Sequence, residues 1–343
     1  MSKKIKIFSY FVFCVLIALL IGEAALRCNA KIIKTKKHIE WLRSLMTYDE
    51  FLGWKHVSNT QVCSESEEYK VFYKINSKGL RDAEYSYDKA KGEFRIVCLG
   101  DSITFGWGVN ANQRFTDLLK SYFTNISVIN MAVQGYGIDQ ELLFLIREGV
   151  RYHPDLILIY VISDDATRAC YSKMWDRPKP QFLLTDKNEL LLSNIPVPRV
   201  DAFSFSNPTL DQIRYYLAKK SYLFWFIQNL LYLSKEKQVE PIDNSTIKIK
   251  LTLAILKRIE RVAELCGAKL VIVGSLVEDE ELPLEGSNIY FINDPLLLYN
   301  GSQSDICYID GHPNVFGNKL IAKVIYDFFV KKKLVPKEYQ LRK

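Results

Sequence analysis

Three residue types that together perform nucleophilic catalysis are spread along the chain. A Gly-Asp-Ser triplet ends at Ser102, and an aspartate and a histidine follow far downstream, at Asp310 and His312. A serine hydroxyl attacks well only when a base removes its proton, and a histidine base needs a carboxylate that holds its tautomer and stabilises its charged form. We therefore expect Ser102 as nucleophile, His312 as base and Asp310 as its partner. The last two can meet only on a bent loop, which Gly311 and Pro313 favour.

The segments that must position these residues alternate between strand and helix patterns. Apolar runs of strand length lie at 94–99, 126–131, 155–162, 269–275 and 289–292, and helical patterns lie at 112–123 and 138–150. Continuous apolar strands that alternate with helices predict a parallel sheet covered on both faces, so we expect a three-layer α/β/α sandwich. In such sheets the functional side chains gather beyond the carboxyl ends of the strands.

This rule selects four loops. They are the loops that carry Asp101 and Ser102, Gly135 and Gly137, Asp164 and Asp165, and Asp310 and His312. Each motif alone is weak evidence for an active site, because a Gly-Asp-Ser triplet also occurs in turns and at helix N-caps. The ordered set, with each member after its strand or before the last helix, predicts one site.

The ordered set resembles the GDSL or SGNH hydrolase family over about residues 47–330, and the lead-in runs YDEFLGW and INSKGLRD are similar to a membrane-anchored bacterial subgroup. The resemblance implies the SGNH hydrolase fold, a flavodoxin-like sheet. It also implies that Ser102 is the nucleophile, that the N–H groups of Ser102 and Gly135 form an oxyanion hole, and that Asp310 and His312 complete the site. We expect Asp101 to fix the serine loop by accepting backbone hydrogen bonds.

Two positions depart from the family pattern. The third motif commonly reads Gly-x-Asn-Asp, and this chain has Asp164 where the asparagine amide would donate to the oxyanion. A carboxylate repels the developing negative charge unless it is protonated, and losing one oxyanion donor costs about 100- to 1,000-fold in rate. We expect either that burial beside Asp101 or Asp165 keeps Asp164 neutral, or that Ser163 donates instead. The second departure is the single residue between the late aspartate and histidine, since two are commoner in the family.

The expected reaction is ester hydrolysis. We expect a serine esterase or deacetylase that removes an O-acyl group from a carbohydrate or cell-surface glycan through an acyl-serine intermediate. Tyr171, Trp175 and Phe182 could form a carbohydrate platform or ordinary packing. Acyl transfer to a sugar hydroxyl through the same site stays open, as does a catalytically silent protein of this fold.

A metal-dependent hydrolase is a further interpretation. Its oxygen and nitrogen ligands would be Asp101, Asp164, Asp165, Asp310 and His312. The sequence has no nucleotide-binding loop, zinc finger or RNA-binding motif, so we expect no cofactor and no nucleic-acid partner.

The amino end carries lysines before an apolar stretch, Ile7–Ile21. A membrane-spanning helix needs about 20 mostly apolar residues, so this stretch fits an uncleaved anchor if Glu23 lies at the interface. A cleaved signal peptide is the alternative, but bulky Leu26 and Arg27 follow the stretch where a peptidase favours small residues. We expect an extracytoplasmic catalytic domain, periplasmic or at the cell surface, although basic residues also follow the span and do not favour that orientation.

The expected organisation has three parts. They are an anchor or signal segment at 1–30, a lead-in at 31–93 and a hydrolase domain at 94–335 with an insertion at about 166–245. Within the insertion, 177–199 reads as a Pro-punctuated loop, and the aromatic run at 222–233 predicts an amphipathic helix packed on the sheet or capping a cleft.

The cysteines and the charge exclude little. The spacing of the seven cysteines fits no metal-binding motif. We expect three of them to be small buried hydrophobic residues: Cys14, Cys98 and Cys266. If the chain is exported, one disulfide could form among the other four: Cys28, Cys63, Cys170 and Cys307. Much of the net charge of +7 comes from lysines near the two ends, which favours solvated tails or a membrane-surface contact over a nucleic-acid groove.

Overall fold

The computed structural model describes residues 3–29, 32–33, 40–41, 44–175, 177–199, 213, 216–218, 220–227, 245–274 and 288–341. The chain divides into two compact units, and the larger one comprises Leu45–Pro198 and Pro241–Lys343. The smaller unit comprises Met1–Ser44 and Arg199–Glu240.

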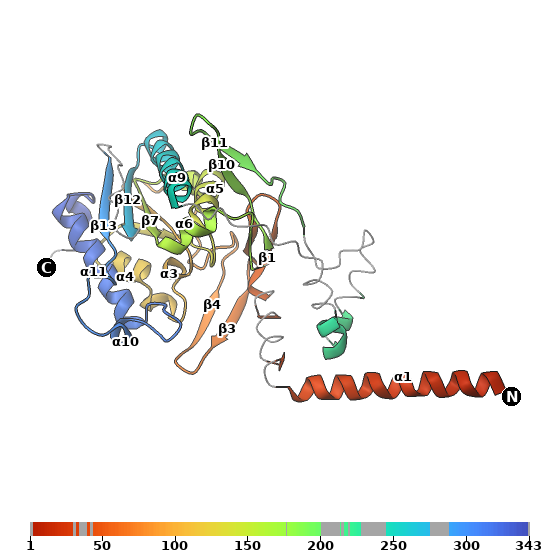
Figure 1. Cartoon of the computed structure of the whole chain (residues 1–343). Helices are drawn as coiled ribbons and strands as arrows, with labels where there is room; N and C mark the ends of the chain where they lie inside the picture. The colour runs from red at the N-terminus through yellow and green to blue at the C-terminus, as the bar shows by residue number, and fades with distance from the viewer. Residues whose placement is uncertain are drawn as a thin grey trace. The chain divides into compact units, whose positions relative to one another are not determined.

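A five-stranded parallel sheet forms the middle of the larger unit (Figure 1). Its strands, in chain order, are β5 (Phe94–Leu99), β6 (Ile126–Asn130), β7 (Leu156–Val161), β12 (Lys269–Gly274) and β13 (Ile289–Asn293). They lie side by side in the order β13-β12-β7-β5-β6, which is the flavodoxin-like order. Every residue of β5 and β7 is buried, which explains why the sequence shows continuous apolar runs rather than alternation.

Helices cover both faces of this sheet (Figure 1). On one face α4 (Phe115–Ser121) and α11 (Val315–Lys331) pack together and share a core with β5, β7 and β12. On the other face α5 (Ile138–Arg147) and α6 (Ser163–Ala169) pack against α9 (Ser245–Cys266). The three-layer α/β/α prediction is therefore confirmed. The remaining short helices are α3 (Ser102–Phe105), α10 (Gln303–Ile306), η1 (Ala111–Gln113), η2 (Gly149–Tyr152) and η3 (Lys337–Tyr339).

The lead-in contributes two antiparallel hairpins to the larger unit. They are β1 (Met46–Asp49) with β2 (Gly53–His56), and β3 (Gln61–Glu65) with β4 (Lys70–Lys74). Arg81 follows them and is buried, and its guanidinium donates to three carbonyls of the 105–109 loop at 2.6 to 2.9 Å. The lead-in therefore holds in place the loop that follows Ser102.

The segment expected to be a Pro-punctuated loop, 177–199, instead contributes strands to two hairpins. They are β8 (Lys173–Met174) with β9 (Arg177–Pro178), and β10 (Gln181–Leu184) with β11 (Leu190–Ser193). Strands of two to four residues leave almost no periodicity in a sequence, and proline is tolerated in such short edge strands. These two facts explain why the pattern read as a loop.

The smaller unit contains α1 (Lys3–Cys28). Residues Ile5–Cys28 are long and apolar enough to cross a membrane, with a mean hydropathy of 2.5, a test that a signal sequence near the N-terminus also passes. Within this helix Glu23 accepts hydrogen bonds from the N–H groups of Tyr222 and Leu223 at 3.0 and 2.8 Å, and from Arg27 at 2.7 Å.

Within the smaller unit, the aromatic run at 222–233 begins on α1, where Tyr222 and Leu223 donate to Glu23. Residues 228–233 lie outside the described part of the chain, so the packing expected for this run stays a prediction. An acidic side chain in an apolar helix is stable only with donors close by, and the first N–H groups of a short helix supply them. Sequence periodicity gives no sign of which surface will offer such a partner.

All seven cysteines lie among the described residues and all are free. The three expected to be buried differ: Cys98 is buried, Cys266 is partly buried and Cys14 is exposed on α1. The last expectation is wrong because the apolar side chains of α1 face outward, as they do on a helix suited to lipid.

Candidate active site

Ser102 lies just beyond the carboxyl end of β5, beside the point where the strand order reverses between β5 and β7. Ser102 is the first residue of α3, and Asp101 is the N-cap, with its Oδ1 accepting the N–H of Ile103 at 2.9 Å. Because Ser102 is at the start of α3, its N–H has no acceptor within that helix. Gly100 has a φ of +149°, and a Cβ there would lie 2.2 Å from Thr104 Oγ1, so the tight turn into Ser102 requires glycine.

The hydroxyl of Ser102 contacts the imidazole of His312. Ser102 Oγ lies 2.9 Å from His312 Nε2 and 3.2 Å from Asp101 Oδ2. On the far side of the ring, His312 Nδ1 lies 3.1 Å from Asp310 Oδ1. This contact lacks the angles of a hydrogen bond, and the buried Nδ1 has no other partner among the described residues. Catalytic hydrogen bonds are often poorly aligned without substrate, so the order of the three groups is the informative observation.

The late loop bends as its glycine allows. Gly311 has a φ of +84° and donates its N–H to Tyr308 O, while Tyr308 N–H donates to His312 O, both at 2.9 Å. Trp107 also supports the loop, since its Nε1 donates to Asp310 Oδ2 at 3.1 Å and its ring centroid lies 5.5 Å from that of His312.

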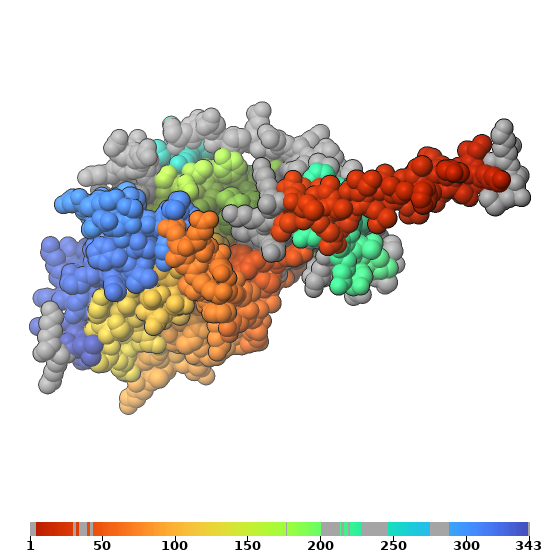
Figure 2. Space-filling view, turned by 90° about the horizontal axis from the view of Figure 1, so that it is seen from below, coloured from red at the N-terminus to blue at the C-terminus, as the bar shows by residue number. Residues whose placement is uncertain are grey.

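The β3–β4 hairpin supports the same loop from outside. The N–H of Ile309 donates to Glu68 Oε2 at 2.9 Å, and Tyr69 packs on Tyr308 with ring centroids 5.1 Å apart. Figure 2 shows these segments side by side, in orange and blue. The lead-in thus holds the loops on both sides of the Ser102–His312 contact.

Asp164 does not lie where burial would keep it neutral. Its side chain is 73% exposed, and its Oδ2 is 3.7 Å from Arg168 Nη2. The fully buried acid is Asp165. Successive residues of a helix point about 100° apart, so α6, which begins at Ser163, turns Asp165 inward and Asp164 outward. The expectation that burial neutralises Asp164 is therefore wrong.

Arg168, which the sequence analysis did not single out, joins the loops beneath Ser102. Its Nη1 donates to Asp101 Oδ2 at 2.9 Å, to Asp165 Oδ1 at 2.5 Å and to Tyr136 O at 3.2 Å. Asp165 also accepts the N–H of Ile162 at 2.9 Å. Burial, and then the charge of Asp101, raise the pKa of Asp165, and Arg168 opposes that shift. The one sequence signal was the three-residue spacing of Asp165 and Arg168 on a helix.

Glu141 adds a third buried acid to this cluster. It is 1% exposed, and neither carboxyl oxygen has a hydrogen-bond partner among the described residues. Burial, and then the charges of Asp165 and Asp101, raise the pKa of Glu141 well above its usual value. The protonated form of Glu141 is therefore favoured, because a buried charge without a partner is costly.

Gly135 lies on the loop after β6, next to the serine loop. The N–H of Val133 donates to Gly100 O at 3.2 Å, which ties the two loops together. Gly135 has a φ of +73°, and a Cβ there would lie 2.2 Å from the Trp175 ring. Only glycine therefore fits both this backbone and the indole that covers it.

The five residues of the metal interpretation are not arranged as ligands. The described part of the chain holds no group of three or more His, Cys, Asp or Glu side chains placed to bind a metal ion. Asp101 and Asp165 are committed to Arg168, and Asp164 points away. These five residues therefore do not form the metal site that was considered from the sequence.

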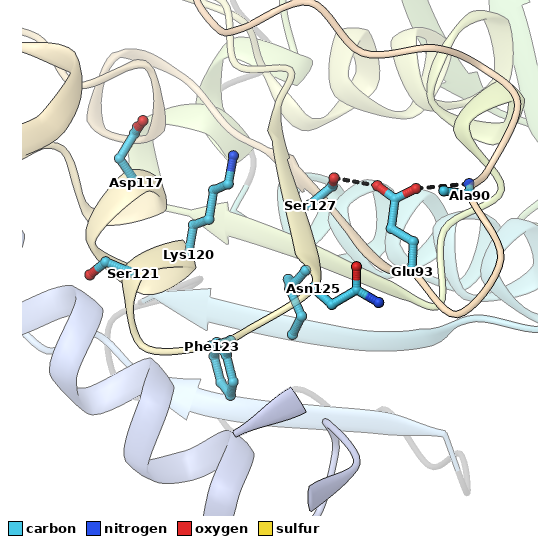
Figure 3. Close-up of a pocket in the computed structure, with 9 residues that line it drawn as sticks. Ala90, Glu93, Asp117, Lys120, Ser121, Phe123, Asn125 and Ser127 are labelled. Carbon is cyan, nitrogen blue, oxygen red and sulfur yellow. Dashed lines mark hydrogen bonds between the residues drawn. The ribbon is translucent and has the colours of Figure 1, made fainter. Parts of the chain in front are cut away.

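An open hollow of about 570 Å³ lies elsewhere, at the amino ends of β5 and β6 (Figure 3). Glu93 points across it but is satisfied by Ser127 Oγ and by the Ala90 N–H at 3.0 Å. The strands are parallel, so this hollow is at the opposite edge of the sheet from Ser102. It is not part of the candidate active site.

Residues 96–212 match the family model described as GDSL-like Lipase/Acylhydrolase. This segment of the chain is therefore similar to a GDSL-like lipase/acylhydrolase domain. This match includes Ser102, Gly135 and Asp164 and ends before Asp310 and His312. The loop that carries Asp310 and His312 is thus linked to the site by its contact with Ser102, and the family match does not reach it.

Several solved structures are similar to this chain at low sequence identity. The psychrotrophic esterase EstA of Pseudoalteromonas, inhibited by monoethylphosphonate, is 16% identical, and the match covers 71% of this chain and 99% of that one with a TM-score of 0.40. A GDSL-like lipase of Bacteroides thetaiotaomicron is 13% identical, with 71% and 91% covered and a TM-score of 0.39. A family 3 carbohydrate esterase of Clostridium thermocellum is 12% identical, with 70% and 96% covered and a TM-score of 0.37. No curated protein sequence matches the chain.

Proposed function

We propose that this GDSL-like protein is a serine esterase or deacetylase that works through an acyl-Ser102 intermediate. The observation that carries the proposal is the 2.9 Å contact between Ser102 Oγ and His312 Nε2. In the first step Oγ attacks the ester carbonyl carbon while Nε2 takes the hydroxyl proton, and Asp310 stabilises the resulting imidazolium. His312 then gives this proton to the leaving alcohol. In the second step His312 takes a proton from water while the water oxygen attacks the acyl-serine carbonyl. His312 then gives this proton to Oγ as the bond between Oγ and the acyl carbon breaks, which releases the acid and restores Ser102.

The oxyanion is assigned to the backbone N–H groups of Ser102 and Gly135. Such donors are effective because they are fixed before the charge develops. Asp164, the third position expected from the family pattern, is proposed to take no direct part, because its side chain is 73% exposed.

Arg168 is proposed to direct the Ser102 proton toward His312. The hydroxyl has one proton and two acceptors close by, Nε2 of His312 at 2.9 Å and Oδ2 of Asp101 at 3.2 Å. Arg168 donates to the same Asp101 oxygen at 2.9 Å and so reduces its capacity to accept from Ser102.

The proposed substrate is an O-acyl group on a carbohydrate or cell-surface glycan. Trp107 beside His312 offers an aromatic face of the kind that stacks on a ring-shaped alcohol. We further propose that residues 1–30 anchor the protein in a membrane, with the 31–93 lead-in and the 94–335 hydrolase domain outside the cytoplasm.

Hydrolysis of p-nitrophenyl acetate by the full chain in detergent tests this function. The wild-type protein is expected to release p-nitrophenol, and Ser102→Ala is expected to reduce the rate to background. Ser121→Ala is a matched control, because Ser121 is an exposed serine at the end of α4. Equal rates in Ser102→Ala and wild type would contradict the proposal, and no rate in either would favour a silent protein of this fold.

A further inference from the structure

Two tryptophans contact different groups of the proposed site. Trp107 lies beside His312, with ring centroids 5.5 Å apart and an Nε1–H bond to Asp310. Trp175 lies over Gly135, where the nearest indole carbon would be 2.2 Å from a Cβ. Trp175 is 49% exposed, so its ring faces both the Gly135 loop and solvent.

The proposed reaction gives these two groups different roles. The leaving alcohol must come within hydrogen-bond reach of His312 Nε2 to receive its proton, so the alcohol part of the ester lies on the side of His312 and Trp107. The carbonyl oxygen points to the N–H groups of Ser102 and Gly135. The acyl chain is the remaining substituent of the carbonyl carbon, and we place it on the Gly135 side, against the indole that covers that glycine.

Trp175 is held over Gly135 by the hairpin that carries it. It follows β8, and Lys179, just after β9, forms an ion pair with Asp139 in which both side chains are fully buried. Lys179 Nζ also donates to Tyr171 O and Pro180 O, each at 3.1 Å.

Asp139 lies in the first turn of α5, directly after the loop that contains Gly135. The buried pair therefore fixes the β8–β9 hairpin to that loop. Trp175 has a φ of +49°, an unfavourable backbone for tryptophan, and its ring centroid is 6.2 Å from that of Trp54. A bulky residue kept in such a conformation at a fixed hairpin is suited to shape a neighbouring pocket.

We propose that Trp175 is a specificity residue that limits the acyl group to short chains such as acetyl. This inference rests on the proposed esterase function of Ser102. The indole occupies the volume that a longer acyl chain would need beyond Gly135, so a long-chain ester cannot bring its carbonyl to Ser102 without displacing the ring. Substrates are therefore short-acyl esters of larger alcohols.

Chain-length profiles of the full-length protein in detergent test this inference. The value of kcat/KM is measured for the p-nitrophenyl esters of acetate, butyrate and octanoate, with wild type, Trp175→Ala and Trp175→Phe. Leu191→Ala is the control, because Leu191 is an exposed residue of the separate β10–β11 hairpin. Wild type is expected to prefer acetate, and the acetate-to-octanoate ratio is expected to fall by at least about 10-fold in Trp175→Ala, since a few methylene groups in a pocket are worth that much.

The variants separate a pocket effect from a folding effect. Trp175→Phe keeps part of the ring, so its ratio should lie between those of wild type and Trp175→Ala, and Leu191→Ala should match wild type. An unchanged ratio in both Trp175 variants, or a wild type that prefers octanoate, would overturn the inference while Ser102-dependent hydrolysis still supports the esterase. Activity that persists in Ser102→Ala would instead overturn the proposed function and this inference with it.

Discussion

Ser102 and His312 are separated by 210 positions in the sequence, and their Oγ and Nε2 atoms lie 2.9 Å apart. The contact forms because β5 ends at Leu99, just before the turn into Ser102, and because the loop before α11 bends back at Gly311. Lead-in residues support both loops, through Arg81 on one and Glu68 on the other. A part of the chain that holds none of the proposed catalytic groups is thus needed for their geometry.

Replacing His312 by alanine should reduce kcat for p-nitrophenyl acetate by at least about 10,000-fold, because Ser102 then has no base. Stability should change little, since the His312 side chain is 25% exposed and lies on a loop. Asp310→Asn should cost less than His312→Ala, because the base itself remains and only the carboxylate that stabilises its charged form is lost. Steady-state kinetics and the Tm of both variants check this, and an Asp310→Asn loss as large as that of His312→Ala would contradict it.

Replacing Asp164 by asparagine should change kcat by less than about 10-fold, although one oxyanion donor is worth about 100- to 1,000-fold. The reason is position, since the Asp164 side chain is 73% exposed and does not point into the cluster under Ser102. The measurement is kcat for p-nitrophenyl acetate at saturating substrate. A rise of more than about 100-fold would show that this residue does reach the oxyanion.

Replacing Arg168 by methionine should destabilise the protein by about 3 to 5 kcal/mol, because it leaves the buried carboxylates of Asp101 and Asp165 without their cation. The loss should be smaller in the double variant Arg168→Met with Asp165→Asn, which removes one of these charges. Urea unfolding of wild type, both single variants and the double variant gives the comparison. If Arg168→Met and the double variant lose the same free energy of unfolding, then Arg168 does not stabilise the fold through its ion pair with Asp165.

Replacing Glu141 by glutamine should change how stability depends on pH. Burial raises the pKa of Glu141 above its value in the unfolded chain, so folding binds a proton, and wild type loses stability as the pH rises above the unfolded pKa. The loss can reach about 1.4 kcal/mol per pH unit until the folded pKa is passed. Glutamine has no proton to lose, so the variant should match wild type near pH 4 and exceed it increasingly toward pH 8, as measured by Tm. A gap that stays constant over this range would mean that Glu141 does not titrate on unfolding.

The sequence predicted the elements whose pattern is imposed by burial on two faces. Strands β5 and β7 read as continuous apolar runs because both of their faces are covered, and the loops after them could be located from the ends of those runs. The β8–β9 hairpin that carries Trp175 could not be found in this way, since its strands have two residues each.

The buried charges beneath the site also left no readable pattern. Asp164 and Asp165 are adjacent and chemically alike, and only the rotation of α6 decides which of them is buried beneath the site. The partner of Glu23 is similarly invisible, because Tyr222 and Leu223 lie about 200 positions away in the chain. Long-range pairing of single polar groups follows from the packed fold and not from local periodicity.

Covalent capture of Ser102 tests the account most directly. The full chain in detergent is incubated with a serine-directed phosphonate ester, and intact-mass and peptide mass spectrometry then locate the adduct in wild type, Ser102→Ala and His312→Ala. The account predicts one adduct on Ser102 in wild type, none in Ser102→Ala and much slower labelling in His312→Ala, because Ser102 is nucleophilic only through its base. No adduct in wild type, or equal labelling of wild type and Ser102→Ala, would contradict the assignment of Ser102 as an activated nucleophile.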